Sequence, residues 1–412
     1  MAFRYRMLEN PSGPSTTTTI CPRIAPMGVF ENNTVHSQGW FALWIHEDYF
    51  PTTDGVCGST RWDKAVFRQL FAWNNGKGPE CVNCGGVQFQ DMLLVNNVEA
   101  GIEGKILKLG NLYDPMTGPL YKNVYVVAHE DSLTPTGDRC NSRAVIPPWS
   151  PGLRIENMIM RNFNGPNCTA LFGTVITCLC TELCGGYEYR IRNITWENTN
   201  NRAEFRWASD VLFRDEDSSM VAGITGLRPM NGALIMPYAP HLPSSKCGPT
   251  APGAGDLGPA YGQGTVRGVR CLPEVTAIRY SVGQLSPSQG VGGNMTVTLL
   301  KGNTQDVPFK SRGLTEPNGW MTTLVNNYTF EVGWRNAPAF TNLSYVAHVE
   351  NFRPGDYVIV RHSGFAKQPD RVQVLANQKP IAPPTVPLNP AINETGSVYF
   401  NATGKYVEYL RK

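Results

Sequence analysis

The chain contains no run of about 18 apolar residues, so none of its segments is predicted to span a membrane as a helix. Almost no segment places apolar residues at i, i+3, i+4 and i+7, which argues against helices as the connections between its apolar runs. Charged residues make up only 17% of the chain, the formal net charge is +3, and Lys and Arg form no cluster. These shortages argue against nucleic acid as a partner.

The N-terminal segment lacks the features of a signal peptide. Residues 1–20 contain neither an apolar core of roughly 7–15 residues nor a small-residue cleavage site. The cysteines and glycosylation sequons described below nevertheless indicate a secreted protein. We therefore expect the chain to be a processed or internal piece of a longer secreted protein.

What the chain does contain is a repeated strand-and-turn unit. Between residues 29 and 220, short apolar runs keep ending in Asn, Asp or His, followed by a turn-forming residue. Successive markers lie about 17 to 42 positions apart, a range typical of solenoid proteins. The markers are Asn32, Asn74, Asn96, His129, Asn162, Asn198 and Asp215.

Two folds fit this repeat. In a right-handed parallel β-helix, each coil contributes two or three short strands, inward side chains stack into a column, and an Asn at one corner bonds to the next coil. Alternatively, Asn-Asn and Asn-Gly mark ordinary hairpin turns of an antiparallel protein. We predict the β-helix, because both the repeat and the shortage of helical segments agree with it.

The C-terminal part of the chain has a different pattern. From residue 272, seven short stretches alternate apolar and polar residues, which is typical of a β-sandwich. The stretch at 379–390 is too rich in proline for a central strand and is predicted to be a stiff linker. The last strands are predicted to form a β-hairpin or an exchanged strand. Because nothing of this chain is left for them to pack on, we expect them to add to the sheet edge of a neighbouring subunit.

At 412 residues the chain is too long for one compact core. We predict an all-β protein of six segments: an N-terminal arm at 1–28, a parallel β-helix at 29–245, a disulfide-closed Gly/Pro-rich insertion at 246–271, a β-sandwich-like domain at 272–378, a proline-rich linker at 379–390, and terminal strands for a subunit contact at 391–412.

Eleven cysteines and eight Asn-X-Ser/Thr sequons together favour an oxidising, secretory environment and N-linked glycans. Cys247 and Cys271 flank the Gly/Pro-rich insertion and are predicted to pair. The spacing Cys81-x-x-Cys84 also fits zinc, but disulfides are the simpler interpretation, and no metal or cofactor is predicted. The other cysteines are Cys21, Cys57, Cys81, Cys84, Cys140, Cys168, Cys178, Cys180 and Cys184. The sequons begin at Asn32, Asn167, Asn193, Asn294, Asn327, Asn342, Asn393 and Asn401.

One stretch resembles the wall of a sugar-binding groove, in which flat rings stack on pyranose faces. It runs from Trp40 to Phe50 and combines aromatic residues with acidic ones. The alternative is a buried aromatic cluster that covers the first coils. The candidate carbohydrate-binding residues are Trp40, Trp44, His46, Glu47, Asp48, Tyr49, Asp54 and Arg61. No catalytic residue is assigned.

Several long strings in the chain carry a family resemblance. They are GWFALWIHEDYFP, VFRQLFAWNNGKGPECVNCGGVQFQDMLLVNNVEAGIEGK, GGYEYRIRNITWENTNNRAEFRW, DVLFRDEDSSMVAG and TNLSYVAHVENFRPGDYVIVRHS. Over roughly residues 24–375 the chain resembles the C-terminal β-helix portion of the fibrocystin and fibrocystin-like family. Similar segments occur in proteins linked to hyaluronan binding and depolymerisation. The resemblance implies a large extracellular or cell-surface glycoprotein with parallel β-helix coils.

Two hypotheses about function follow. The first is a structural glycoprotein of a cell-surface coat or filament, secreted or at the cell surface, which self-associates or joins other subunits through its ends. The second is a module that binds or depolymerises a hyaluronan-like polysaccharide. The second requires two carboxylates, or an acid with an Arg or His, that face each other across a groove.

Overall fold

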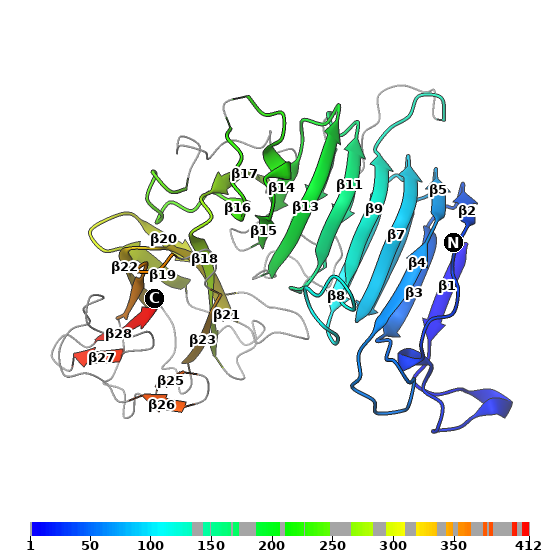
Figure 1. Cartoon of the computed structure of the whole chain (residues 1–412), viewed down its shortest axis with the longest axis horizontal. Coiled ribbons are helices and arrows are strands. Elements are labelled where there is room, and N and C mark those ends of the chain that lie inside the picture. Colours follow the sequence, from blue (N-terminus) through cyan, green and yellow to red (C-terminus); the bar gives the residue numbers. More distant parts are fainter. Residues whose placement is uncertain are drawn as a thin grey trace. The chain divides into compact units, whose positions relative to one another are not determined.

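The computed structural model describes most of the chain and shows an all-β protein (Figure 1). The helices among the described residues are three short 3₁₀ turns, η1 (Gly13–Ser15), η2 (Pro22–Ile24) and η3 (Ser219–Val221). None of the helices described is long and apolar enough to cross a membrane. The described residues are 2–133, 143–148, 150–165, 168–172, 187–206, 211–225, 227–247, 265–282, 294–309, 319–335, 343–348, 353–363, 374–376, 379–381, 398–401 and 406–411.

The chain forms two compact units. One consists of Met1–Pro237 with Asp256–Val269 and Gly313–Glu316, and the other of Tyr238–Gly255, Arg270–Arg312 and Pro317–Lys412.

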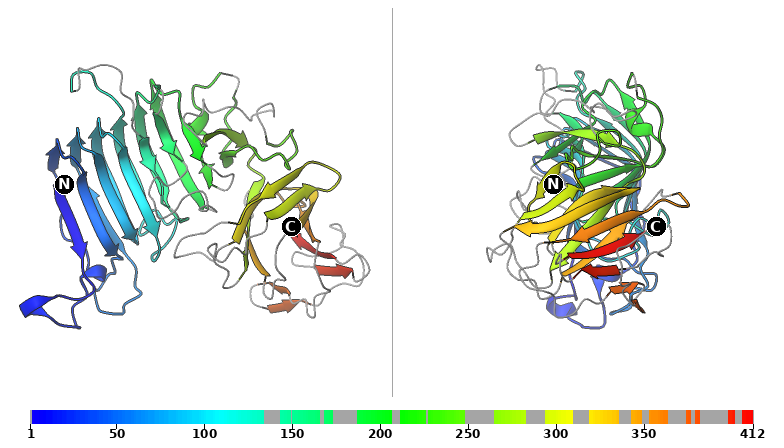
Figure 2. Two further views of the ribbon diagram at one scale, coloured as in Figure 1. Left: turned by 180° about the vertical axis from the view of Figure 1, so that it is seen from behind. Right: turned by 90° about the vertical axis from the view of Figure 1, so that its left-hand side faces the viewer.

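In the first unit the chain alternates between two ladders of parallel strands (Figures 1 and 2). With one exception in the second ladder, strands that follow each other in sequence belong to different ladders, so neighbours within a ladder come from successive passes of the chain. The first ladder comprises β1 (Phe3–Met7), β3 (Phe41–Tyr49), β6 (Lys77–Cys84), β8 (Ala100–Leu107), β10 (Arg143–Ile146), β12 (Thr169–Phe172) and β14 (Ala203–Arg206). The second comprises β2 (Asn33–His36), β4 (Lys64–Arg68), β5 (Leu70–Trp73), β7 (Gly86–Val95), β9 (Leu120–Val127), β11 (Arg154–Arg161), β13 (Tyr187–Glu197) and β15 (Val211–Asp215).

Apolar side chains from both ladders fill a continuous core. Residues that are partners in register lie one above another in it: Phe89 of β7 lies opposite Tyr121 of β9, and their rings stack at 5.4 Å. Ile155 of β11 lies opposite Ile191 of β13 in the same way, and both are fully buried. The predicted all-β fold with parallel strands is therefore confirmed in its class.

Four strands of the second ladder share a bend, and the side chains at the bend form a row of hydrogen bonds that we call the amide ladder. Asp91, Asn123, Asn157 and Asn193 take left-handed φ values between 52° and 55°, which Asn and Asp tolerate better than most residues. The Nδ2 of Asn123 donates to Oδ1 of Asp91 at 2.8 Å. The Nδ2 of Asn157 donates to Asn123 at 3.0 Å, and that of Asn193 donates to Asn157 at 2.8 Å. The ladder holds the same bend in four successive strands.

The bend also changes which side chains face the core. Phe89 and Met92 are both buried in it although three positions separate them. In an unbroken strand such residues would point to opposite faces. Asp91 between them supplies the change of direction.

A second set of amides lies where the Asn and His residues that end the apolar runs of the sequence come together. Asn198 donates from Nδ2 to Oδ1 of Asn162 at 2.8 Å, and Asn162 donates to the carbonyl of His129 at 2.7 Å. Asn96 accepts from the backbone N–H of Glu130 at 2.7 Å. The prediction that these markers bond to the next pass of the chain is confirmed at these positions.

The parallel ladders end in two different ways. At one end β16 (Ala233–Pro237) pairs antiparallel with β15, and β17 (Thr265–Cys271) pairs antiparallel with β14. At the other end β1, from the segment predicted as an N-terminal arm, pairs with β3. Phe3 and Tyr5 of β1 are half-buried against Phe30.

The second unit contains mainly antiparallel sheets. One has the order β21 (Gly319–Val325), β18 (Val275–Val282), β23 (Leu343–His348). The other has the order β20 (Thr304–Val307), β19 (Asn294–Leu299), β22 (Tyr328–Arg335), β24 (Val358–His362), β28 (Tyr406–Arg411), β27 (Val398–Asn401), with β22 and β24 parallel. The right-hand view of Figure 2 shows strands of this second sheet side by side, in yellow to red.

Rings from the two sheets meet in the core of this unit. Tyr280 of β18 contacts Trp334 of β22 at 5.6 Å and His362 of β24 at 5.5 Å between ring centroids. Trp320 of β21 contacts Trp334 at 5.9 Å. These contacts hold the two sheets together.

The end of the chain differs from the sequence-based prediction. The hairpin is present, because β27 pairs antiparallel with β28. However, β28 also pairs with β24 of the same chain, so the prediction that the hairpin has nothing of this chain to pack on is wrong. Of the predicted linker at 379–390, Lys379–Ile381 forms β26 and pairs with β25 (Val374–Ala376), while the rest lies outside the described residues.

Three disulfides are described: Cys21–Cys57, Cys81–Cys84 and Cys247–Cys271. The predicted pairing of Cys247 with Cys271 is confirmed. Cys81 and Cys84 bond to each other, which fits the disulfide interpretation rather than zinc. Cys168 is also disulfide-bonded. The remaining cysteines, Cys140, Cys178, Cys180 and Cys184, lie outside the described residues.

Candidate functional site

The structure separates the eight predicted carbohydrate-binding residues into three groups. Tyr49 is in the core at 1% exposure and donates its hydroxyl hydrogen bond to the carbonyl of Ala25. Asp54 and Arg61 form an ion pair at 3.4 Å on the excursion that follows β3. The other residues lie on or beside β3 itself.

Within β3, the acidic end is tied to its neighbours. Asp48 forms ion pairs with Arg23 at 3.2 Å and Lys108 at 3.4 Å, and it accepts from Nδ2 of Asn83 at 2.8 Å. Glu47 lies 3.9 Å from Nδ1 of His46. Asp48 therefore serves to join neighbouring segments.

The aromatic residues of this region form what we call the aromatic platform: Trp40, Phe41, Trp44 and His46. Trp44 and His46 stand two positions apart in a strand, hence on one face, and their rings stack at 4.3 Å. The rings of Phe41 and Trp44 stack at 5.0 Å, and Trp40 lies 5.3 Å from Trp44. Trp40 is 53% exposed. Arg4 of β1 places its guanidinium 5.0 Å from the Trp44 ring.

Beside the platform lies a buried charged cluster of Lys77, Glu80, Glu103 and Lys105, which the sequence analysis missed. In register, Trp44 lies opposite Glu80, and Glu80 lies opposite Glu103. Nε1 of Trp44 donates to Oε1 of Glu80 at 3.0 Å. Nζ of Lys77 donates to Glu103 at 2.6 Å, and Lys105 donates to the other oxygen of Glu103. A search for charge pairs near in sequence would find Glu103 with Lys105, but only the fold brings Glu80 to Glu103.

Burial sets the protonation of this cluster. It raises the pKa of Glu80 to about 7; the charge of Glu103 also raises it, while Lys105 and Lys77 oppose the change. Burial alone would also raise the pKa of Glu103, but the ammonium groups of Lys105 and Lys77 outweigh it and lower that pKa. Burial lowers the pKa of His46 on the platform.

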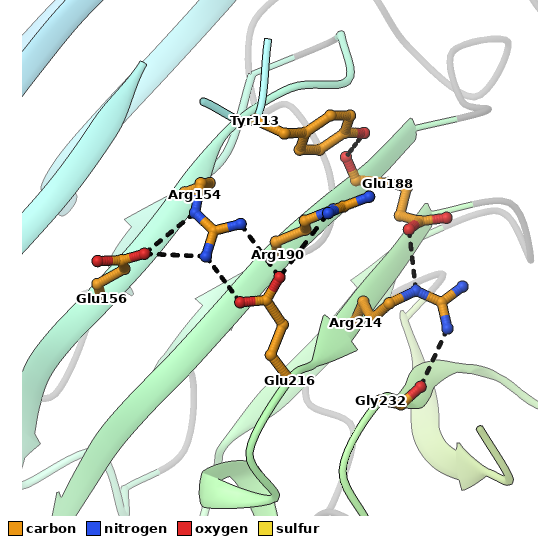
Figure 3. Close-up of polar contacts among 8 residues, drawn as sticks. All are labelled: Tyr113, Arg154, Glu156, Glu188, Arg190, Arg214, Glu216 and Gly232. Atoms are coloured by element: carbon orange, nitrogen blue, oxygen red, sulfur yellow. Dashed lines mark hydrogen bonds and ion pairs between the residues drawn. The ribbon is translucent and has the colours of Figure 1, made fainter. Parts of the chain in front are cut away.

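A second group of ion pairs runs across β11, β13 and β15 (Figure 3). Arg154, Arg190 and Arg214 are partners in register on these three strands. Arg154 pairs with Glu156 at 2.9 Å and with Glu216 at 2.7 Å, and Glu216 also lies 3.9 Å from Arg190.

Further contacts complete this group. Arg214 pairs with Glu188 at 3.1 Å and donates to the carbonyl of Gly232 at 3.0 Å. The hydroxyl of Tyr113 donates to the carbonyl of Glu188 at 2.7 Å, and the guanidinium of Arg190 lies 4.7 Å from the centroid of the Tyr113 ring. The acidic residues compensate three stacked arginines, so this group stabilises the contact between strands rather than presenting a free cationic site.

The carboxyl pair beside the platform is buried. Glu80 and Glu103 are the two carboxyl groups brought together beside the platform, but they are 3% and 0% exposed, so a polymer could not reach them. Among the described residues, no three His, Cys, Asp or Glu side chains are placed to hold a metal ion.

Four of the predicted glycosylation sites have exposed side chains: Asn32, Asn193, Asn294 and Asn327. The amide of Asn193 belongs to the amide ladder, and that of Asn327 donates to Asp356 at 3.0 Å. Asn401 ends β27, and Asn167, Asn342 and Asn393 lie outside the described residues.

Comparison with known proteins places the chain beside the fibrocystins. It is 33% identical to Fibrocystin-L of Homo sapiens and 34% identical to Fibrocystin-L of Mus musculus, in each case over 410 residues, or 99% of this chain. It is 24% identical to Fibrocystin of Mus musculus over 387 residues, or 94% of this chain.

The chain spans 9% of the length of the Fibrocystin-L proteins and 8% of that of Fibrocystin. No protein-family model matches the chain, and no solved structure matches it significantly. The relatives nevertheless match along almost the whole sequence, which confirms the resemblance that the sequence indicated: the chain is related to the fibrocystin family.

Proposed function

We propose that this chain is a structural part of an extracellular or cell-surface glycoprotein, in which a right-handed parallel β-helix and a β-sandwich form a scaffold that assembles through its ends. The observation that carries the proposal is the use of carboxyl groups such as Glu103 and Glu216 in ion pairs between strands, together with the burial of the carboxyl pair beside the platform. A surface built for hydrolysis would instead present two carboxyl groups to a groove.

The β-helix is supported by the alternation of the chain between two parallel ladders with a shared core. Antiparallel hairpins would place neighbours in sequence side by side within one sheet. Here β7 pairs with β9 and β9 with β11, while β8 belongs to the other ladder. The β-sandwich is supported by the ring contacts between the two sheets of the second unit.

An extracellular location is supported by the disulfides and the sequons. Disulfides such as Cys21–Cys57 and Cys247–Cys271 persist in oxidising compartments. Exposed asparagines in sequons, such as Asn32 and Asn294, suit N-linked glycans on the surface of a secreted protein.

Assembly is supported by the unlike ends of the first unit. Antiparallel strands β16 and β17 terminate the parallel ladders at one end. At the other end, β1 and β2 each pair with one strand within the described residues, which leaves an edge of the kind that templates further strand pairing.

The proposal is tested by the state of the purified glycoprotein. Sedimentation velocity over a wide concentration range, combined with electron microscopy, is expected to show ordered assemblies. A chain that stays monomeric at the highest concentration, and shortens a polysaccharide such as hyaluronan, would overturn it.

A second candidate is polysaccharide binding at the aromatic platform. The observation that favours it is the exposure of Trp40 beside Trp44, with the cationic Arg4 next to them, since exposed rings can stack on sugar faces. Binding to immobilised polysaccharides should fall at least tenfold in Trp40→Ala. A matched control is Trp73→Ala, because Trp73 is a half-buried ring on the other ladder, stacked on His36. Equal losses in both variants would remove the platform as the site.

A further inference from the structure

Glu80 and Glu103 form a carboxyl pair whose surroundings are unequal. Glu103 accepts hydrogen bonds from the ammonium groups of both Lys77 and Lys105. Glu80 accepts one bond at Oε1, from Trp44. Its other oxygen, Oε2, is buried and accepts none, and it lies 3.6 Å from each of the two ammonium groups.

A buried carboxylate oxygen that accepts no hydrogen bond is unfavourable, because it has lost its bonds to water. A proton on Oε2 removes that cost when it is donated to the neighbouring carboxylate of Glu103. Two carboxyl groups on neighbouring strands in register also repel each other when both are ionised, so one proton bound between them is favoured. With Glu80 neutral, the charges of Lys77 and Lys105 balance those of Glu103 and the more exposed Glu99, which lies 3.3 Å from Lys77.

We propose that Glu80 carries a proton at Oε2 which it shares with Glu103, and that loss of this proton changes the hydrogen bond and position of Trp44, so that the aromatic platform responds to pH. The link is direct, because the acceptor of the Trp44 indole N–H is the other oxygen of the same carboxyl group. An ionised acceptor draws the indole more strongly than a neutral one. Burial, which raises the pKa of Glu80 to about 7, places the change near neutral pH.

Other charged groups face this region and must be separated from Glu80. Arg4 of β1 lies over Trp44, and His46 of β3 stacks on it. Tyr121 of β9 is buried near both glutamates. Its burial raises its pKa, and the charges of Glu103 and Glu80 raise it further. Arg143 of β10 lies opposite Ala100 in register. Of these groups only His46 can titrate between about pH 5 and pH 8.

The experiment reads the indole of Trp44 without any ligand. The full chain is labelled with ¹⁵N-tryptophan, and the Trp44 signal is assigned by its loss in Trp44→Phe. Between about pH 5 and pH 9, we expect this signal to shift once, with a midpoint near pH 7. The Trp196 indole, which donates to the backbone carbonyl of Ser219, is expected to stay constant and reports that the fold is intact.

Three variants assign the shift. Glu80→Gln is expected to abolish it, whereas Glu99→Gln and His46→Gln are expected to keep it with the same midpoint within about half a unit. No shift in the wild type over this range, a shift that survives in Glu80→Gln, or one that disappears in His46→Gln would overturn the proposal. If Glu80→Gln does not fold, persistence of the wild-type shift in the other two variants carries the assignment.

The consequence for binding rests on the second candidate function, that of polysaccharide binding at the platform. The pH-dependent shift of the Trp44 signal does not rest on that function, because the shift is measured on the free protein. A shift near pH 7 without any polysaccharide binding would therefore support the switch and reject the binding site. Binding that is the same at pH 6 and pH 8, with no shift of Trp44, would reject the switch alone.

Discussion

In the first unit most strands lie beside a parallel strand from the next pass of the chain, and at some positions residues of one type meet across the pair. Asn157 lies on Asn123, and Arg190 lies opposite Arg154. In the second unit most neighbouring strands run antiparallel, and aromatic rings meet between the two sheets, as Tyr280 of β18 and His362 of β24 do. The parallel pairs show that stacking of like polar residues needs groups that can hydrogen-bond to each other, as amides do, or counter-charges such as Glu216.

The largest expected effect comes from emptying the core of either unit. Phe89→Ala removes a fully buried ring that contacts Phe67 and Tyr121, and it should lower the free energy of unfolding of the first unit by about 3–5 kcal/mol. Trp320→Ala should do the same in the second unit. Hydrogen exchange followed by mass spectrometry resolves the two effects. If either variant lowered protection from hydrogen exchange equally in both units, the two units would not have separate cores.

The two units should respond to acid differently. Burial lowers the pKa of His362 in the second unit to about 4. The fold favours the neutral imidazole. Its contribution to the free energy of unfolding is therefore fully present above about pH 6.5, and about 3 kcal/mol of it is lost as the pH falls towards 4. Amide exchange in β21 and β22 should accelerate over this window. The pH dependence should be weaker in His362→Phe, and an unchanged dependence in that variant would contradict the role of the imidazole.

The amide ladder provides a smaller effect that is specific to the first unit. Asn157→Ala removes a rung that both donates and accepts, and it puts alanine at a φ of 53°. We expect a loss of about 2 kcal/mol. The matched control is Asn157→Gly, which loses the same bonds but tolerates the backbone angle, and should cost about 1 kcal/mol. Chemical unfolding measures both, and equal losses would mean that the left-handed angle carries no strain.

The last effect concerns Glu80, and its sign is opposite to that of His362. The pKa of Glu80 is raised in the fold, so its contribution is fully present below about pH 4.5 and is lost as the pH rises through about 7. Glu80→Gln stays neutral and should therefore be more stable than the wild type at pH 8, with little difference at pH 5. Thermal unfolding at the two pH values measures this. A variant that is less stable at both would show that the carboxylate is needed in its ionised form.

The sequence predicted those parts of the fold whose signal is local. Asn162 and Asn198 stand at the ends of apolar runs and bond between passes, as expected. Cys247 and Cys271 flank a Gly/Pro-rich stretch of the sequence and pair. The hairpin at the end was also visible, but its partner β24 was not, because pairing between distant strands leaves no mark in either sequence.

The candidate site was harder to predict, because it depends on register. Trp44 and His46 share a face by strand alternation, which the sequence shows. Tyr49 was placed with them but points into the core, after an irregularity in pairing between Ile45 and Asp48. The contact of Trp44 with Glu80 joins residues 36 positions apart, and only the observed pairing of β3 with β6 reveals it.

Engineered disulfides on the outer face of the second ladder test the stacked parallel arrangement most directly. Ile159 and Thr195 are partners in register on β11 and β13, so Ile159→Cys with Thr195→Cys should form a crosslink that peptide mapping detects. Tyr125 lies opposite Ile159 on β9, two strands away from Thr195, so Tyr125→Cys with Thr195→Cys should form none. A crosslink in the second variant and its absence in the first would contradict the parallel stack.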